Sequence, residues 1–105
     1  MDAIKYFLNP ASIAVVGASE RLTSSGGAVL RNLRVSGYRG RIVPVNPKGG
    51  AIDGLEVAVS LKAMESPVEL VAVLVKPDSI LDVVSEAAET GHKNILILPG
   101  GFAEA

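Results

Sequence analysis

The sequence lacks several features that would point to particular kinds of chemistry. Its 105 residues include no cysteine, so the chain forms no disulfide, has no thiolate metal site and offers no thiol nucleophile. Ten lysines and arginines almost balance eleven aspartates and glutamates, for a formal net charge of −1. A general nucleic-acid-binding domain would show a basic excess, so we expect no nucleic-acid partner.

Long hydrophobic runs are also missing. The longest apolar stretch, residues 68–75, is interrupted by Glu69 and is far too short to cross a bilayer. The N-terminal stretch MDAIKYFLNPASIAVV carries one lysine and an Asn-Pro break, which is not the pattern of a signal peptide. We therefore expect a cytoplasmic protein without a membrane partner.

No catalytic group stands out. His92 is the one histidine, and it follows Gly91, where we expect a helix to end. No serine or aspartate is placed to make it a catalytic base, so we expect a surface or helix-capping residue. Glu86 and Glu89 fall on the polar side of the same helix. The sequence therefore predicts no catalytic residue and no metal ligand in this chain.

The chain does carry alternating strand and helix patterns, and its length suits one domain. Four strands are expected from apolar runs, the first of them, SIAVVG, continuous as in a strand buried on both faces. The expected elements are strands at 12–17, 41–45, 68–75 and 94–98, helices at 28–36, at 61–64 and from Pro77 to Gly91, and a short strand near 56–59. Ser79 and Asp82 have capping-box spacing at the start of the long helix.

This alternation predicts an α/β fold: a Rossmann-like parallel sheet with helices on both faces, in a single domain. Ligands of such sheets bind beyond the carboxyl ends of the strands. The unusual residue clusters all follow predicted strands, at 17–27, 46–50, 76–79 and 99–101. Their shared position predicts a nucleotide-like ligand at that edge.

The loop after the first strand favours phosphate binding. Gly17 allows a ligand to approach the backbone closely, and a helix N-terminus offers N–H groups to an anion. Ala18 follows, and the loop adds hydroxyls from Ser19, Thr23, Ser24 and Ser25 before Gly26. A plain flexible loop is the alternative.

The second strand ends in Asn46-Pro47-Lys48 rather than in the acid that binds a ribose hydroxyl in NAD domains. The first loop also departs from the G-x-G-x-x-G fingerprint, so a plain NAD site fits poorly. Lys48 suits a phosphate on the adenosine ribose, as in coenzyme A or NADP; the alternative is a solvated surface lysine. Lys76-Pro77 and Pro99-Gly100 fit either a ligand-lining role or ordinary turns.

Five motifs in order carry a resemblance to a known family: SIAVVGAS, VLRNL, GYRGRIVPVNPK, VELVAVLVKP and GHKNILILPGGFAEA. They resemble the coenzyme A-binding domain of NDP-forming acyl-CoA synthetases. That group includes the ADP-forming acetyl-CoA synthetases and is similar to the α subunit of succinyl-CoA synthetase. The resemblance covers nearly the whole chain.

The resemblance implies specific roles at the carboxyl edge of the sheet. Gly17, Ala18 and Ser19, with the loop residues Ser24, Ser25 and Gly26, would lie near the phosphates of coenzyme A. Lys48 of the Asn46-Pro47-Lys48 motif would pair with a phosphate. Lys76, Pro77, Leu98, Pro99 and Gly100 would line the nucleotide and the approach of the pantetheine arm.

The family joins an acid to coenzyme A with conversion of ATP to ADP and phosphate, reversibly, through an acyl phosphate and a phosphohistidine. The phosphohistidine and the ATP-grasp domain belong to other domains or to another subunit, and His92 does not match the phosphohistidine. Residues 1–105 thus resemble the N-terminal coenzyme A-binding domain of a longer ligase, which alone would bind but not catalyse. The alternatives are a stand-alone, non-catalytic coenzyme A-binding module and an NADP-binding redox domain.

Overall fold

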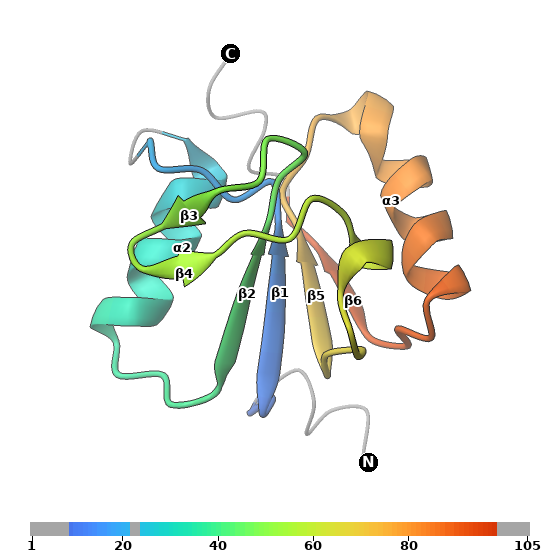
Figure 1. Cartoon of the computed structure of the whole chain (residues 1–105). Helices are drawn as coiled ribbons and strands as arrows, with labels where there is room; N and C mark the ends of the chain where they lie inside the picture. Colours follow the sequence, from blue (N-terminus) through green and yellow to red (C-terminus); the bar gives the residue numbers. More distant parts are fainter. Residues whose placement is uncertain (1–8, 22–23, 99–105) are drawn as a thin grey trace.

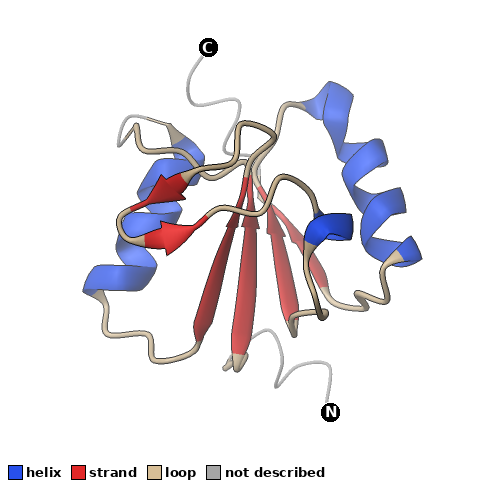
Figure 2. Ribbon diagram, in the orientation of Figure 1, coloured by secondary structure: helices blue, strands red, loops and turns tan. Residues whose placement is uncertain are grey.

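The computed structural model describes residues 9–21 and 24–98. Its main feature is a four-stranded parallel sheet in the order β2-β1-β5-β6. Figure 2 shows these four strands side by side and pointing the same way. The strands are β1 (Ser12–Val16), β2 (Arg41–Val45), β5 (Leu70–Val73) and β6 (Ile95–Ile97). The predicted Rossmann-like α/β fold is confirmed.

The two long helices cover opposite faces of the sheet, α2 (Ser25–Val35) on one and α3 (Pro77–Glu89) on the other (Figure 1). Successive side chains of a strand point to opposite faces. Val15 of β1 therefore packs in one cluster with Leu30 of α2, while Ala14 packs in the other with Ala87 of α3. Because β1 has no solvent-facing side, its sequence is a continuous apolar run, as predicted.

Helix α2 begins at Ser25, three residues before the predicted start at Ala28. The Ser24 hydroxyl accepts a hydrogen bond from the Gly27 amide at 3.0 Å and caps the helix. The prediction was wrong because the Gly26-Gly27 pair was interpreted as loop, whereas a side chain at Gly26 would collide with the Gly17 carbonyl. Glycine is required there for close packing of the helix on the strand end.

Helix α3 lacks the predicted capping box, and that prediction was wrong. Its N-cap is Lys76, which makes no side-chain capping hydrogen bond, and Pro77 is the first helical residue. Because the ring of Pro77 suits that first position, Ser79 lies inside the helix, with its amide bonded to the Lys76 carbonyl at 2.9 Å. The other end is as predicted: Gly91 adopts a φ of 85° immediately after the C-cap.

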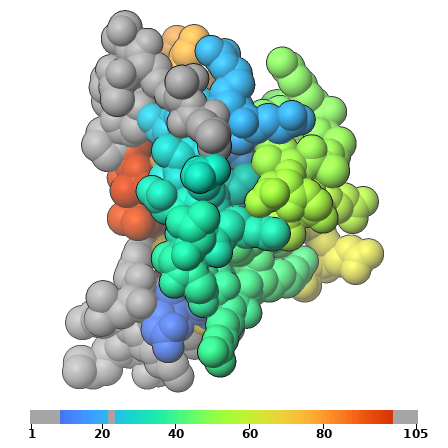
Figure 3. Space-filling view, turned by 90° about the vertical axis from the view of Figure 1, so that its left-hand side faces the viewer, coloured from blue at the N-terminus to red at the C-terminus, as the bar shows by residue number. Residues whose placement is uncertain are grey.

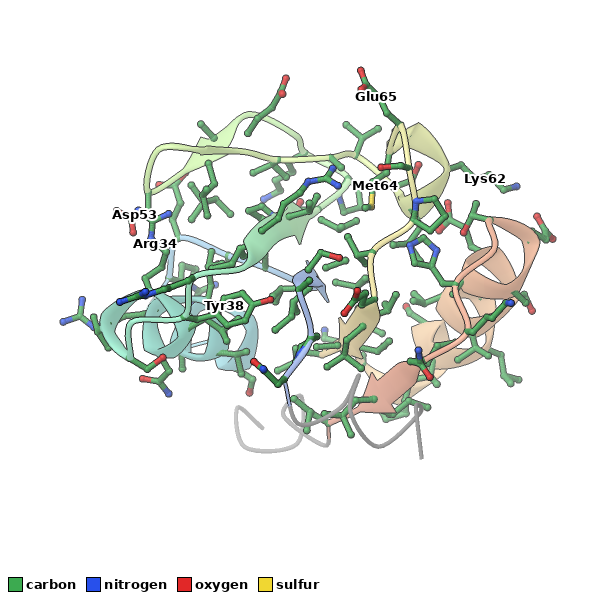
Figure 4. All side chains as sticks on the ribbon, turned by 90° about the horizontal axis from the view of Figure 1, so that it is seen from below. Arg34, Tyr38, Asp53, Lys62, Met64 and Glu65 are labelled. Carbon is green, nitrogen blue, oxygen red and sulfur yellow. The ribbon has the colours of Figure 1, made fainter. Side chains whose placement is uncertain are left out.

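A small hairpin follows β2 in place of the single short strand predicted near residues 56–59. It pairs β3 (Ala51–Ile52) with β4 (Leu55–Glu56), and the turn uses Asp53 at φ 51° and Gly54 at φ 80°. Arg34 of α2 and Asp53 point toward each other in Figure 4 and form an ion pair of 3.5 Å. The hairpin is therefore attached to the α2 side of the molecule.

The chain then returns to the sheet through one bridge between Val45 and Ala58. A single 3-10 turn, η1 (Leu61–Ala63), follows and is capped by the Ser60 hydroxyl, close to the brief helix predicted at 61–64. Within residues 9–21 and 24–98, no helix has the length and apolar character needed to cross a bilayer.

Candidate functional site

The strand order creates a switch point between β1 and β5. From β1 the chain passes through α2 to β2, while β5 lies on the other side of β1 and leads to α3 on the opposite face. The loops after β1 and β5 therefore diverge at the carboxyl edge of the sheet. Open α/β sheets bind their ligands in the crevice formed by such a divergence.

The backbone after β1 is built into the sheet. Gly17 donates its amide to the Val45 carbonyl at 3.1 Å and adopts a φ of 96°, and an added side chain would collide with the Leu74 carbonyl. Ala18 is fully buried, so its methyl group belongs to the core and only its backbone can face a ligand. Any contact of these two predicted site residues with a ligand would therefore be made by their backbone.

The hydroxyls of Ser19 and Ser24 form hydrogen bonds within the loop and the first turn of α2. Ser19 Oγ accepts a hydrogen bond from the Arg21 amide at 3.0 Å. Ser24 Oγ, which caps α2, also donates to the Arg21 carbonyl at 2.8 Å. Ser25 is the first residue of α2. These bonds fix Ser19 and Arg21 beside the N-terminus of α2, whose dipole adds a partial positive charge.

Asn46 links the loop after β1 to the turn that carries Lys48. Its Nδ2 donates to the Ala18 carbonyl at 2.9 Å, and its Oδ1 accepts from the Lys48 amide at 2.9 Å. Both ends of the amide are thereby engaged within the protein. The structure thus gives Asn46 a positioning role, which a sequence pattern cannot distinguish from contact with a ligand.

A surface cavity of about 280 Å³ brings together three of the predicted residues, Ser19, Asn46 and Lys48. A second cavity of about 290 Å³ also includes Ser19 and extends along α2 toward the hairpin. Figure 3 shows loop 18–21 in blue, α2 in teal and the hairpin in yellow-green on the face that holds these depressions. Ser19, Glu20 and Ile52 line both cavities.

The remaining predicted residues lie elsewhere on the carboxyl edge. Lys76 and Pro77 form the start of α3, and Leu98 donates its amide to the Val73 carbonyl at 3.0 Å just after β6. None of these three lines either cavity. Pro99 and Gly100 lie outside the described residues.

Sequence reasoning missed Arg21, Glu20 and Ile52, which line the cavity that contains Lys48. A charged pair in a Gly- and Ser-rich loop after a buried strand was an available signal for the first two. No local signal marked Ile52, because its position depends on the hairpin folding back against the loop.

His92 is 5 % exposed, so the surface location expected from the sequence was wrong. Its Nε2 accepts a hydrogen bond from the Val68 amide at 3.2 Å, and its Nδ1 lies 2.9 Å from Thr90 Oγ1. The His92 amide donates to the Ala87 carbonyl at 2.9 Å and completes the end of α3. The helix-capping role expected from the sequence is therefore confirmed for the backbone of His92. Burial lowers the pKa of the His92 ring, although a backbone hydrogen bond to Ala87 partly opposes this. The ring therefore joins α3 to the start of β5.

Acidic and histidine side chains do not cluster in the part of the chain that the structure describes: no three of them are placed to share a metal ion.

Comparison with known proteins gives a consistent result. The sequence model of a family described as "CoA binding domain" matches residues 11–105. The chain is 38 % identical to the α subunit of acetate–CoA ligase (ADP-forming) I of Pyrococcus furiosus, over 97 % of this chain and 23 % of that protein. It is 32 % identical to acetate–CoA ligase (ADP-forming) of Methanocaldococcus jannaschii, over 96 % of this chain and 14 % of that protein.

A solved structure shows the same arrangement. It is the apo form of a "dinucleotide forming Acetyl-coenzyme A synthetase 1" from Ca. Korarchaeum cryptofilum. The TM-score is 0.87 at 30 % identity, covering 95 % of this chain and 22 % of that one. This chain therefore spans less than a quarter of each of these three proteins.

Proposed function

The chain belongs to the CoA-binding domain family, and we propose that it binds coenzyme A at the carboxyl edge of its sheet, as the N-terminal domain of an ADP-forming acyl-CoA synthetase. The observation that carries the proposal is the cavity that joins Lys48 to Ser19 and Asn46 beyond the carboxyl ends of β1 and β2. A lysine at the end of β2 favours a ligand whose adenosine ribose carries a phosphate.

The loop residues supply the anion-binding part of the proposed site. Gly17 allows the ligand to approach the backbone, and the N-terminus of α2, capped by Ser24, attracts phosphate through its dipole. Lys48 is exposed and lines the cavity, where its ammonium group pairs with the phosphate on the ribose. Asn46 holds the Lys48 turn against the loop at Ala18.

The other residues on this edge line the approach of the ligand. Lys76 and Pro77 begin α3 on the far side of the switch point, and Leu98 follows β6. We assign the nucleotide and the pantetheine arm to the space along these two segments. Pro99 and Gly100, which lie outside the described residues, belong to the same proposed set.

In the complete ligase this domain would present the thiol of coenzyme A to an acyl phosphate. The phosphohistidine and the ATP-grasp fold would be supplied by other domains or by another subunit. His92 does not take the phosphohistidine role, because its ring is buried between α3 and β5 and both ring nitrogens are engaged. The 105-residue chain alone is therefore expected to bind coenzyme A without turnover.

Calorimetric titration of the chain with coenzyme A and with 3′-dephospho-coenzyme A tests the proposal. We expect Lys48→Gln to weaken binding of coenzyme A about 10- to 100-fold, the effect of losing one charge-assisted contact. Lys93→Gln is the matched control, because Lys93 is an exposed lysine beyond the other end of the sheet. Absence of binding of either ligand at millimolar concentration refutes the proposal, and equal affinity for both removes the ribose-phosphate role of Lys48.

A parallel titration with NADPH separates the redox alternative, since NADPH also carries a phosphate on its adenosine ribose. Tight NADPH binding that coenzyme A does not displace would replace the proposed function. The length of the native reading frame separates the other alternative: a stop codon soon after Ala105 favours a stand-alone coenzyme A-binding module.

A further inference from the structure

We propose that Arg21 is a second cation for the ribose phosphate and, together with Lys48, makes this domain selective for a 3′-phosphorylated nucleotide. The inference rests on the proposed function and adds to it a residue that determines specificity. It begins from the cavity of about 280 Å³, which Arg21 and Lys48 line from two different loops.

The backbone of Arg21 is fixed although the residue lies in a loop. Its amide donates to Ser19 Oγ at 3.0 Å. Its carbonyl accepts from the Ser24 amide at 3.0 Å and from the Ser24 hydroxyl at 2.8 Å. A side chain at Gly27 would collide with this carbonyl, so the loop lies directly against the first turn of α2. The guanidinium group therefore extends from an ordered point beside the N-terminus of the helix.

The position of the Lys48 backbone is fixed relative to the loop that carries Arg21. Asn46 bonds both the Lys48 amide and the Ala18 carbonyl, so the two cation-bearing loops are tied together by one side chain. No hydrogen bond or ion pair occupies the side chain of Arg21 or of Lys48 among the residues that the structure describes. Both cations are thus available to an anion.

The net positive charge of the cavity lining depends on Arg21. Glu20 lines the same cavity, and the other lining residues, Ser19, Asn46, Gly49 and Ile52, are uncharged. Lys48 alone would be balanced by Glu20, which leaves a neutral cavity with little attraction for a phosphate. With Arg21 the lining carries one net positive charge, and the planar fork of a guanidinium suits two phosphate oxygens at once.

The test is a calorimetric titration of the 105-residue chain and its variants with coenzyme A and 3′-dephospho-coenzyme A. The readout is the Kd for 3′-dephospho-coenzyme A divided by the Kd for coenzyme A, because loss of a contact to the 3′-phosphate weakens the binding of coenzyme A alone. A charge-removing variant far from the cavity shows how much overall charge by itself changes this ratio. We expect Arg21→Gln to reduce this ratio about tenfold or more. Arg39→Gln, which removes another exposed arginine at the opposite edge of the sheet, should leave the ratio unchanged.

Two further variants separate the contact between Arg21 and the 3′-phosphate from the net charge of the cavity. Arg21→Lys keeps the charge without the fork, so we expect an intermediate ratio, and this variant also serves if Arg21→Gln does not fold. Arg21→Gln combined with Glu20→Gln restores the net charge of the cavity but not the contact, so the ratio should stay low. Full restoration of the ratio in the double variant, or an unchanged ratio in Arg21→Gln, overturns the inference.

The unmodified chain distinguishes the two levels of failure. If it binds neither ligand, the proposed function fails and the inference with it. If it prefers coenzyme A over the 3′-dephospho form and the Arg21→Gln variant has the same ratio of Kd values, only the role of Arg21 is wrong.

Discussion

Replacing Asn46 with alanine should destabilise the domain and weaken its ligand binding together. The change removes two hydrogen bonds of 2.9 Å, from Nδ2 to the Ala18 carbonyl and from the Lys48 amide to Oδ1. Each contributes about 0.5–1.5 kcal/mol net, so the expected loss in the free energy of unfolding is about 1–3 kcal/mol. For a domain of this size, a loss of about 2 kcal/mol lowers Tm by about 8–16 °C.

The effect on affinity follows from the same two bonds. Without them the loop at Ala18 and the turn at Lys48 must be ordered by the ligand, and each 1.4 kcal/mol of ordering free energy reduces affinity about tenfold. Asn46→Asp separates the two bonds, because a carboxylate can still accept from the Lys48 amide but cannot donate to the Ala18 carbonyl. It should retain part of the affinity that Asn46→Ala loses.

The measurements are thermal unfolding followed by circular dichroism and calorimetric titration with coenzyme A. Asn32→Ala is the control: Asn32 is exposed on α2, so its removal should change stability by no more than about 0.5 kcal/mol. If Asn46→Ala abolishes coenzyme A binding while Tm stays at the wild-type value, Asn46 contacts the ligand directly and the positioning role is refuted.

Two further predictions concern packing and pH. Gly26→Ala should destabilise the domain by about 1–3 kcal/mol, because the new Cβ would collide with the Gly17 carbonyl. Helix propensity alone predicts that the same change stabilises the domain by about 1 kcal/mol. The sign of the change in the free energy of unfolding, measured with urea, decides between the two effects. Burial lowers the pKa of His92 in the folded state below its ordinary value of 6.5. The stability that His92 contributes should therefore be complete above about pH 6.5 and be lost as pH falls through the folded-state pKa, since protonation removes the acceptor for the Val68 amide. Urea unfolding between pH 5 and 7.5 should show this decline in the wild type and a weaker one in His92→Gln; identical pH dependence in both proteins would contradict it.

The strands were predictable because the apolar runs that mark them in the sequence reflect burial of both sheet faces. The bounds of β2 match the prediction, 41–45, since Pro47 follows soon after and prevents the ladder from continuing. The other three strands are shorter at one end or both than their apolar runs, because pairing stops where the neighbouring strand ends. The prediction that a ligand site lies at the carboxyl edge followed from the parallel topology.

Local rules failed where a nearby part of the fold decided the outcome. The start of α2 was placed too late because Gly26 and Gly27 were interpreted as loop, whereas both lie in the helix and pack too closely on the preceding backbone to carry a side chain. The capping box of α3 was predicted from spacing, yet Pro77 fixes where that helix begins. His92 was expected at the surface, because nothing near it in the sequence shows that the amide of Val68 would require its ring as an acceptor.

For the candidate site, the sequence determined which strand ends carry phosphate-compatible residues, and it placed Ser19, Asn46 and Lys48 among them. Burial periodicity and the turn preferences of glycine and proline are local properties, so they can be derived from residue order. Only the tertiary structure decided that Asn46 ties two loops together and that Arg21 and Glu20 share a cavity with Lys48. These relations join residues more than twenty positions apart, and their distances are set by how β1 and β2 pair and how the hairpin packs against α2.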